Sequence, residues 1–281
     1  MMKRPEIIRS VFSLPPAEGE FSIDAVCLKA IEKSLGKYTM EHEEKVSKYK
    51  RALYAELKAA DYAHHASGGI MSFNYVDERF YKLRWNTLSK GDKRIGKKIR
   101  DRSAAVSWIE SLDDSRNYEY LGGLLMKKLG ASKLFITPPG NEFGIDFLAI
   151  VPAFSRSNIF VSKNKGIRIV GQSKLYRSAV SRDKIQSFND VMSSIRNNKA
   201  ELIGILPAWF RSSSAPIVGF FVAHSGYQSG AKISAEQNGY TLIDSLGAAE
   251  IISCCGKMDH VKNATELDRY LWREIAELKS Q

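Results

Sequence analysis

The sequence has few of the residues that build thiolate metal sites or disulfide scaffolds. Its 281 residues include three cysteines, which form no CxxC pair, and five histidines, which lack the spacing of metal ligands. No apolar run approaches the ~18 residues of a membrane span. The basic first residues, MMKRPEIIRSVF, contain Glu6 and Arg9 where a signal peptide needs an apolar stretch. We therefore expect a soluble cytoplasmic protein that needs no membrane partner.

Basic residues outnumber acidic residues, 42 against 31, which gives a net charge of +11. Such a surplus is typical of proteins with an anionic partner, either nucleic acid or an anionic membrane surface. Residues 88–102 hold seven basic residues against two acidic ones, and residues 156–184 hold eight against one. Either segment could follow a phosphate backbone or form a solvated surface. The candidate nucleic-acid contacts are Lys90, Lys93, Arg94, Lys97, Lys98, Arg177, Arg182 and Lys184.

The first hundred residues favour helices. Residues 5–20 contain three prolines and Gly19, and this composition predicts an extended leader. Residues 22–62 are rich in Ala, Glu, Lys and Leu, which predicts helix, divided in two at Gly36. The aromatic residues of 70–86 fit strand and helix equally. We expect residues 1–103 to form a mainly helical N-terminal domain that serves DNA recognition or oligomerisation.

From about residue 104 the predicted strands alternate with helices, which indicates an α/β domain with a mixed sheet. The expected strands are 145–151, 167–175, 202–206, 217–223 and 240–244. The expected helices are 117–129, 182–195, 229–238, 246–252 and 264–279. We place this domain at residues 104–260, with a C-terminal helix in 261–281.

Four polar residues stand out because their predicted elements are otherwise apolar. Asp146 is the single charge of its strand, and a buried lone acid is costly unless it is paired or bound to a metal. Gln172 and Lys174 lie two residues apart, so both project to the same face of the next strand. Glu119 is the single acid of its helix. Carboxylate and amide oxygens suit a hard divalent cation, and an ammonium group can position a water, which is the chemistry of phosphodiester hydrolysis.

Each of these residues also has a purely structural interpretation. Asp146 could be a strand-end acid that pairs with Arg168. Lys174 could protect an edge strand from pairing with another chain. Glu119 could be an ordinary exposed helix residue, and the glycine pair 122–123 could pack against a sheet or approach nucleic acid closely.

The order of these segments resembles the PD-(D/E)xK nuclease superfamily, in its Mrr-like restriction endonuclease branch. The residues that carry the resemblance are Glu119 in NYEYLGGLLMKKLG, Gly144-Ile145-Asp146, and Gln172-Ser173-Lys174. Residues 220–252 are similar to the closing strand, loop, helix, strand and helix of that branch. The likeness covers about 116–255. It departs from the branch at His224, where a threonine is usual, and in the long segment between Asp146 and Gln172.

The resemblance implies a restriction-endonuclease-like fold with a central mixed sheet flanked by helices. It also implies a Mg²⁺- or Mn²⁺-dependent endonuclease that hydrolyses DNA phosphodiester bonds in restriction or anti-phage defence. Asp146 would be the principal metal ligand, with Gln172 and the backbone carbonyl of Ser173 as further ligands. Lys174 would stabilise the attacking nucleophile and the developing phosphate charge. Glu119 would bind a second metal or orient Lys174.

Two other functions remain open. One is a nuclease of the same fold that acts on RNA or branched DNA, and the other is a catalytically inactive nucleic-acid-binding module. The retained Asp146, Gln172 and Lys174 argue against the inactive module. Double-strand cleavage would favour a homodimer, although no self-complementary patch can be recognised in the sequence.

Overall fold

The computed structural model describes residues 2–86, 93–140, 143–152, 166–202, 204–255 and 261–280. The chain divides into two compact units. The first is built mainly from Met1–Ser111, and the second mainly from Leu112–Ile251 and Tyr270–Gln281. Among the described residues, no helix combines the length and the apolar character that a membrane crossing requires.

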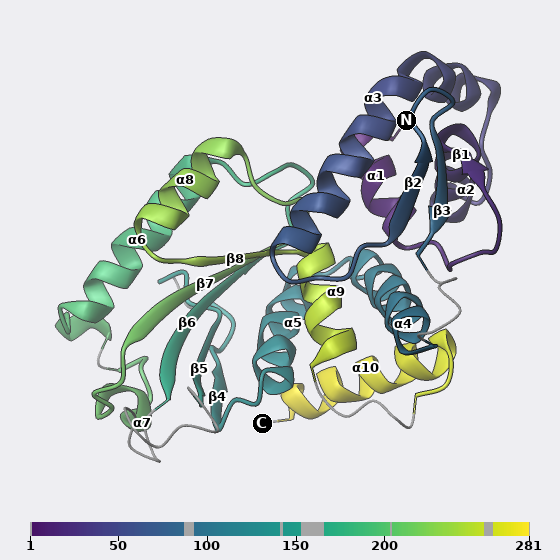
Figure 1. Cartoon of the computed structure of the whole chain (residues 1–281). Coiled ribbons are helices and arrows are strands. Elements are labelled where there is room, and N and C mark those ends of the chain that lie inside the picture. The colour runs from purple at the N-terminus through teal and green to yellow at the C-terminus, as the bar shows by residue number, and fades with distance from the viewer. Residues whose placement is uncertain are drawn as a thin grey trace. The chain divides into compact units, whose positions relative to one another are not determined.

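The first unit contains four helices and a small antiparallel sheet among its described residues (Figure 1). The helices are α1 (Arg4–Phe12), α2 (Ile23–Leu35), α3 (Met40–Ala66) and α4 (Lys93–Glu110). The strands are β1 (Phe21–Ser22), β2 (Phe73–Asp77) and β3 (Lys82–Trp85), in the order β1-β3-β2. The aromatic segment 70–86 is therefore a hairpin, and the boundary expected between residues 103 and 104 falls inside α4.

The helix break expected at Gly36 is confirmed, because this residue ends α2 with a φ of 79°. The extended leader expected at 5–20 is wrong in its first half, which forms α1. Pro5 lies in the first turn of α1, where the missing N–H has no helical partner to lose. Ile7 and Val11 bury one face of this helix, so tertiary packing outweighs the proline signal.

The second unit holds a five-stranded mixed sheet with helices on both faces, which confirms the expected fold class. The strand order is β4-β5-β6-β7-β8; β4, β5 and β6 pair antiparallel, and β6, β7 and β8 pair parallel. The strands are β4 (Lys133–Ile136), β5 (Phe147–Val151), β6 (Ile167–Lys174), β7 (Ile217–Ala223) and β8 (Thr241–Asp244). The helices are α5 (Ser115–Lys128), α6 (Arg182–Arg196), α7 (Ala208–Arg211), α8 (Ser229–Gln237), most of α9 (Ser245–Cys254) and the end of α10 (Ala264–Lys279).

The strand expected at 202–206 is wrong. Residues Ala200–Leu202 form a 3₁₀ helix, and Leu206 donates its backbone N–H to the carbonyl of Leu202 at 3.0 Å. Both leucines are buried, so the apolar run LIGIL enters the core through a helical turn. A short apolar run does not distinguish these two cases. The edge strand β4, in contrast, was not anticipated from the sequence.

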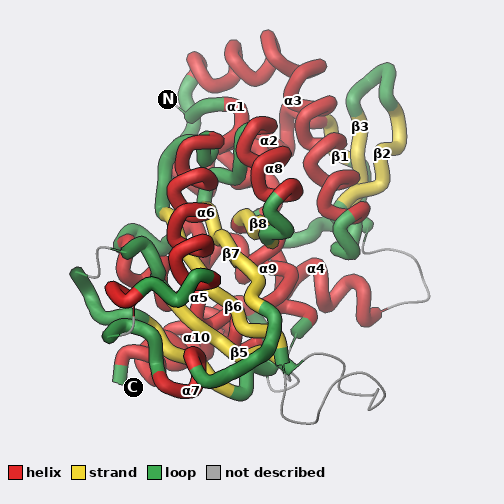
Figure 2. Tube along the Cα trace, turned by 90° about the vertical axis from the view of Figure 1, so that its left-hand side faces the viewer, coloured by secondary structure: helices red, strands yellow, loops and turns green. Residues whose placement is uncertain are grey.

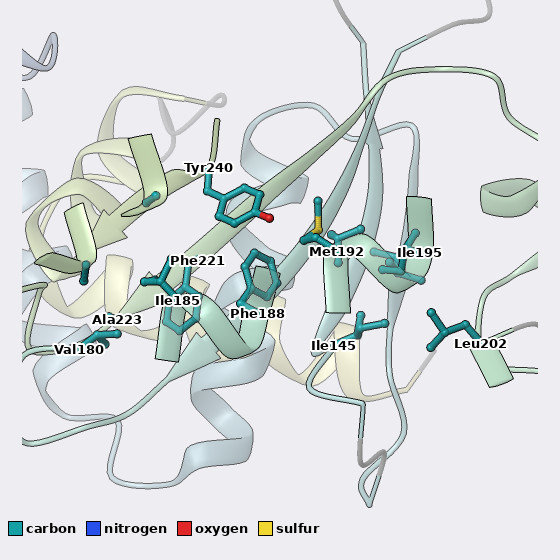
Figure 3. Packing of buried hydrophobic residues seen from close by; sticks show 14 of the residues in the cluster. Ile145, Val180, Ile185, Phe188, Met192, Ile195, Leu202, Phe221, Ala223 and Tyr240 are labelled. Atoms are coloured by element: carbon teal, nitrogen blue, oxygen red, sulfur yellow. The ribbon is translucent and has the colours of Figure 1, made fainter. Parts of the chain in front are cut away.

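Helices α6 and α8 cover one face of the sheet (Figure 2). The predicted helical stripe of Ile185, Phe188, Met192 and Ile195 is buried there, as Figure 3 shows. The ring of Phe188 lies edge-on to Phe221 of β7, with centroids 5.6 Å apart. Each such fully buried side chain contributes roughly 1.5–3 kcal/mol. This packing fixes β6 and β7 in the middle of the sheet.

Helix α5 covers the other face at unusually close range. A Cβ added to Gly122 would overlap the ring of Phe147, and one added to Gly123 would lie 2.7 Å from Ile136. The interpretation of these glycines as a packing surface is therefore confirmed. Each glycine costs roughly 1 kcal/mol of helix propensity relative to alanine. The close approach brings the N-terminal turns of α5, including Glu119, next to the ends of β5 and β6.

Candidate active site

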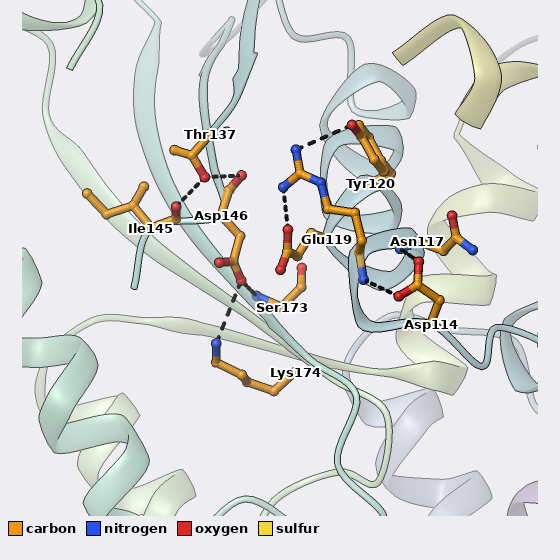
Figure 4. Close-up of polar contacts among 10 residues, drawn as sticks. Asp114, Asn117, Glu119, Tyr120, Thr137, Ile145, Asp146, Ser173 and Lys174 are labelled. Atoms are coloured by element: carbon orange, nitrogen blue, oxygen red, sulfur yellow. Dashed lines mark hydrogen bonds and ion pairs between the residues drawn. The ribbon is translucent and has the colours of Figure 1, made fainter. Parts of the chain in front are cut away.

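Asp146 lies one residue before β5, with its backbone held from both sides (Figure 4). Its N–H donates to the carbonyl of Gly171 in β6 at 2.9 Å, and its carbonyl accepts from the N–H of Thr137 at 3.0 Å. The Thr137 hydroxyl donates to the same carbonyl at 3.1 Å. Asp146 thus stands at the point where β5 enters the sheet, beside the last residues of β6.

The glycine two residues earlier explains the G-I-D sequence. Gly144 has a φ of 66°, a left-handed conformation that favours glycine. Its carbonyl accepts a 2.8 Å hydrogen bond from Nε2 of Gln172, and a Cβ on Gly144 would lie 2.8 Å from that nitrogen. This bond fixes the orientation of the Gln172 amide. Its Oε1 makes no hydrogen bond within the described part of the chain and is available as an oxygen ligand.

The carboxylate of Asp146 is largely buried, with 12% of its side chain exposed. Its Oδ2 accepts a 2.6 Å hydrogen bond from the backbone N–H of Ser173 and lies 4.0 Å from Nζ of Lys174. The side chains expected to form one site therefore converge at the C-terminal end of β6, where Figure 4 shows Lys174 extended toward Asp146.

Two structural alternatives are ruled out by this geometry. Arg168 does not pair with Asp146, because its guanidinium donates to the carbonyls of Ala215 at 2.8 Å and Phe210 at 3.0 Å. Lys174 does not protect an edge, because β6 is the third of five strands. Asp146 and Lys174 therefore do not have the purely structural roles that their sequence context allowed.

Burial raises the pKa of Asp146 to about 6. The nearby Lys174 ammonium and the N–H of Ser173 lower this pKa, and the Glu119 carboxylate raises it further. Arg116 lowers it slightly. Asp146 is consequently ionised at neutral pH, and below about pH 6 a proton competes with any cation for its oxygens.

In Figure 4 Glu119 lies beside Asp146, and its ion-pair partner is Arg116. Nη2 of Arg116 donates to the Tyr120 hydroxyl at 3.3 Å, and the guanidinium stacks on that ring at 4.7 Å. Asp114 caps the helix by accepting from the N–H of Arg116 at 3.2 Å. Sequence inspection missed Arg116, although its i,i+3 spacing from Glu119 was a usable signal.

Three basic candidates are exposed and make no ion pair with described residues. Arg177 lies three residues beyond β6, and Arg182 and Lys184 lie in the first turn of α6. Because α6 begins beyond the C-terminal end of β6, all three lie at the same end of the sheet as Lys174. This placement leaves them free for phosphate contact.

The candidates near α4 differ from one another. Lys97 pairs with Asp101 at 2.7 Å, whereas Lys98 is exposed. Lys90 and the side chains of Lys93 and Arg94 lie outside the described residues. The last basic residue of this run, Arg102, is buried and donates to the Ser72 hydroxyl at 2.7 Å. It is therefore part of the core of the first unit and not a surface cation.

The donor atoms at the site are oxygens. Asp146 supplies a carboxylate and Gln172 an amide oxygen. The carbonyl of Ser173 points to the same side of β6 as that of Gly171, which faces Asp146, because backbone groups repeat every second residue of a strand. Oxygen donors suit Mg²⁺ and Mn²⁺. No group of three or more His, Cys, Asp or Glu suited to a metal occurs in the described ranges.

A family model decides the relationship of this chain to known proteins. The Mrr_cat model, described as a restriction endonuclease, matches residues 112–252. The chain belongs to this restriction endonuclease family. The matched range contains Glu119, Asp146, Gln172 and Lys174, so the resemblance inferred from their order is confirmed at the level of the family.

Among solved structures, two restriction endonucleases align with this chain. One is described as MspJI restriction endonuclease in complex with a 27-mer oligonucleotide, and the other as the DNA modification-dependent restriction endonuclease AspBHI. Each is 16% identical with a TM-score of 0.41 and covers 63% of this chain. The chain spans 36% and 40% of those two proteins. No curated protein matches the sequence.

Proposed function

We propose that this protein is a Mg²⁺-dependent endonuclease that hydrolyses DNA phosphodiester bonds in restriction or anti-phage defence. Membership of the restriction endonuclease family supports a nuclease that acts on DNA. The observation that carries the rest is the convergence of Asp146, Gln172 and Lys174 at the end of β6. An inactive binding module would have no need for an ammonium group 4.0 Å from a buried carboxylate.

Asp146, Oε1 of Gln172 and the carbonyl of Ser173 would hold the cation, with Glu119 as a second anionic group nearby. When bound, Mg²⁺ neutralises phosphate charge and polarises the scissile group. The hydrogen bond from Ser173 and the bond between Gln172 and Gly144 keep both protein ligands in place before substrate arrives. Such preorganisation avoids the cost of reorienting dipoles during the reaction.

Lys174 would act on the phosphate itself. Water attacks phosphorus and loses a proton to solvent, one P–O ester bond breaks as the new P–O bond forms, the leaving oxygen takes up a proton, and negative charge accumulates on the phosphate oxygens. The Lys174 ammonium, held near Asp146, would lie beside this charge and orient the attacking water. The exposed Arg177, Arg182 and Lys184 would bind phosphates along the strand.

A substrate panel tests this proposal. Supercoiled plasmid, single-stranded DNA, a four-way junction and RNA are each incubated with the full chain, with Mg²⁺ and with EDTA. We expect nicking or linearisation of the plasmid with Mg²⁺ and no cleavage with EDTA. Preferential cleavage of RNA or of the junction would replace the duplex substrate by the corresponding alternative. Binding without cleavage in every divalent cation would contradict the proposal.

A further inference from the structure

In the first unit, a short turn at the predicted break of Gly36 joins two helices, as in a helix-turn-helix motif. Helix α2 ends at Leu35, the four residues Gly36–Thr39 form the turn, and α3 begins at Met40. A turn of three or four residues that contains glycine is typical of this motif, whose second helix enters the major groove in DNA-binding proteins. The match to the restriction endonuclease family model begins at residue 112, so it does not include these helices.

Helix α3 also carries a β-hairpin beside it. The buried carboxylate of Asp61 accepts from the backbone N–H groups of Ser72 at 2.8 Å and Phe73 at 3.0 Å, where β2 begins. Lys58 forms an ion pair with Glu78 at the hairpin turn. These contacts fix the β2–β3 hairpin against α3, and Figure 1 shows the helix and the hairpin side by side.

Several exposed cations of α3 and the hairpin make no ion pair with described residues. Lys48 and Arg51 lie one turn apart on α3, are exposed, and make no ion pair with described residues. Lys50, by contrast, pairs with Asp24. Exposed basic side chains without ion pairs also occur on the hairpin, namely Arg79, Lys82 and Arg84. Ser47 and Ala55 flank the α3 cations with small side chains, which permit close approach of another backbone.

We propose that α3 binds duplex DNA in the major groove, through a face formed by Ser47, Lys48, Arg51 and Ala55. The hairpin cations then contact the adjacent phosphates. This inference deepens the proposed function, because it names the surface that selects the DNA to be cut. Two acids in the first turn, Glu41 and Glu43, and Glu44 directly after them repel phosphates, so the contact is confined to the helix from Ser47 onward.

Binding and cleavage by the full chain are measured separately. Fluorescence anisotropy with a random-sequence duplex, in EDTA at several salt concentrations, gives the affinity and its salt dependence. The test variant is Lys48→Ala/Arg51→Ala. The matched control is Lys133→Ala/Lys199→Ala, which removes two exposed lysines of the second unit that make no ion pair with described residues. Thermal unfolding verifies that all variants fold.

We expect the α3 variant to bind at least tenfold more weakly than the control, and its log–log salt slope to fall by up to roughly 1.8 if both side chains contact phosphates. An Arg51→Lys variant should keep the salt slope but change the pattern of cut sites on a plasmid. Equal affinity and slope in the α3 and control variants would overturn the inference while leaving nuclease activity untouched. Loss of binding in a chain that never cuts would overturn the proposed function and leave this inference standing.

Discussion

Asp146 illustrates, at the scale of one residue, how a carboxylate proposed for catalysis opposes stability. Its carboxylate is ionised at neutral pH although burial disfavours the charged form and raises its pKa to about 6. The folded chain therefore binds this proton more tightly than the unfolded chain does. The stability that this proton contributes is fully present below the unfolded pKa of 3.8 and is lost as the pH rises through 6.

Replacing Asp146 by asparagine should consequently stabilise the metal-free protein at pH 8, by about 2–3 kcal/mol. The amide oxygen can still accept the hydrogen bond from Ser173. At pH 4 the folded Asp146 is protonated and neutral, so most of the difference should disappear. Thermal unfolding in EDTA at the two pH values measures this, with the exposed Asp113→Asn as the control. A stability gain of the same size at pH 4 would show that charge burial is not its cause.

Arg116 determines what Glu119 can do. Its guanidinium neutralises the Glu119 carboxylate and is held in place by stacking on Tyr120. In an Arg116→Gln variant, Glu119 becomes free to turn toward a cation, so affinity for Mn²⁺ at pH 8 should rise several-fold. Arg116→Lys, which keeps the charge, should stay near wild type. Titration by calorimetry gives both constants.

The double variant Arg116→Gln/Glu119→Gln separates this effect from a general change in charge. It has the same net charge as wild type but lacks the freed carboxylate, so its Mn²⁺ affinity should not exceed that of wild type. Equal Mn²⁺ affinity in Arg116→Gln and wild type would remove Glu119 from the metal site.

At the scale of elements, the site depends on how closely α5 approaches the sheet. Alanine at Gly122 would gain roughly 1 kcal/mol of helix propensity, but its methyl would overlap Phe147, and overpacking costs about 1–3 kcal/mol. We expect Gly122→Ala to lower the free energy of unfolding and to weaken cleavage by shifting Glu119. Chemical denaturation checks this, with Gly204→Ala as control, because a methyl there meets nothing within 4 Å. A more stable Gly122→Ala protein would contradict the packing of α5.

Sequence patterns predicted elements well where one periodicity dominates. The stripe from Ile185 to Ile195 and the helix at 264–279 were predicted almost to the residue, because their buried positions repeat at helical spacing. The run LIGIL misled because its burial follows a turn rather than a strand. Helix α1 was missed because prolines dominate the local signal, while burial of Ile7 and Val11 is a tertiary effect.

The residue types and their order predicted which residues form the candidate site, but they did not predict its geometry. The sequence pointed to Asp146, Gln172 and Lys174, and the structure brings them together. No local pattern shows that Gly144 orients Gln172, because this contact depends on the meeting of separate segments. The β2–β3 hairpin at residues 70–86 stayed ambiguous for the same reason, since strand pairing is long-range. The ion pair between Arg116 and Glu119 lies within one helix, and its spacing was a usable signal.

At the scale of the whole molecule, the net charge of +11 should make DNA binding strongly dependent on salt. Each lost phosphate contact should reduce the log–log slope by roughly 0.9 on duplex DNA. Neutralising Arg177 and Arg182 together, at the end of the sheet beside Lys174, should therefore flatten the slope relative to Lys133→Ala/Lys199→Ala. An unchanged slope would mean that this end of the sheet faces solvent in the complex.

The most direct measurement of the central claim is plasmid cleavage by Lys174→Ala in Mg²⁺. The ammonium group is proposed to stabilise charge that exists in the transition state, and loss of such a group often costs ~10²–10³-fold in rate. We predict that loss for Lys174→Ala, with folding and DNA affinity retained and with Lys199→Ala cleaving at the wild-type rate. Cleavage by Lys174→Ala at near the wild-type rate would contradict the assignment of the active site.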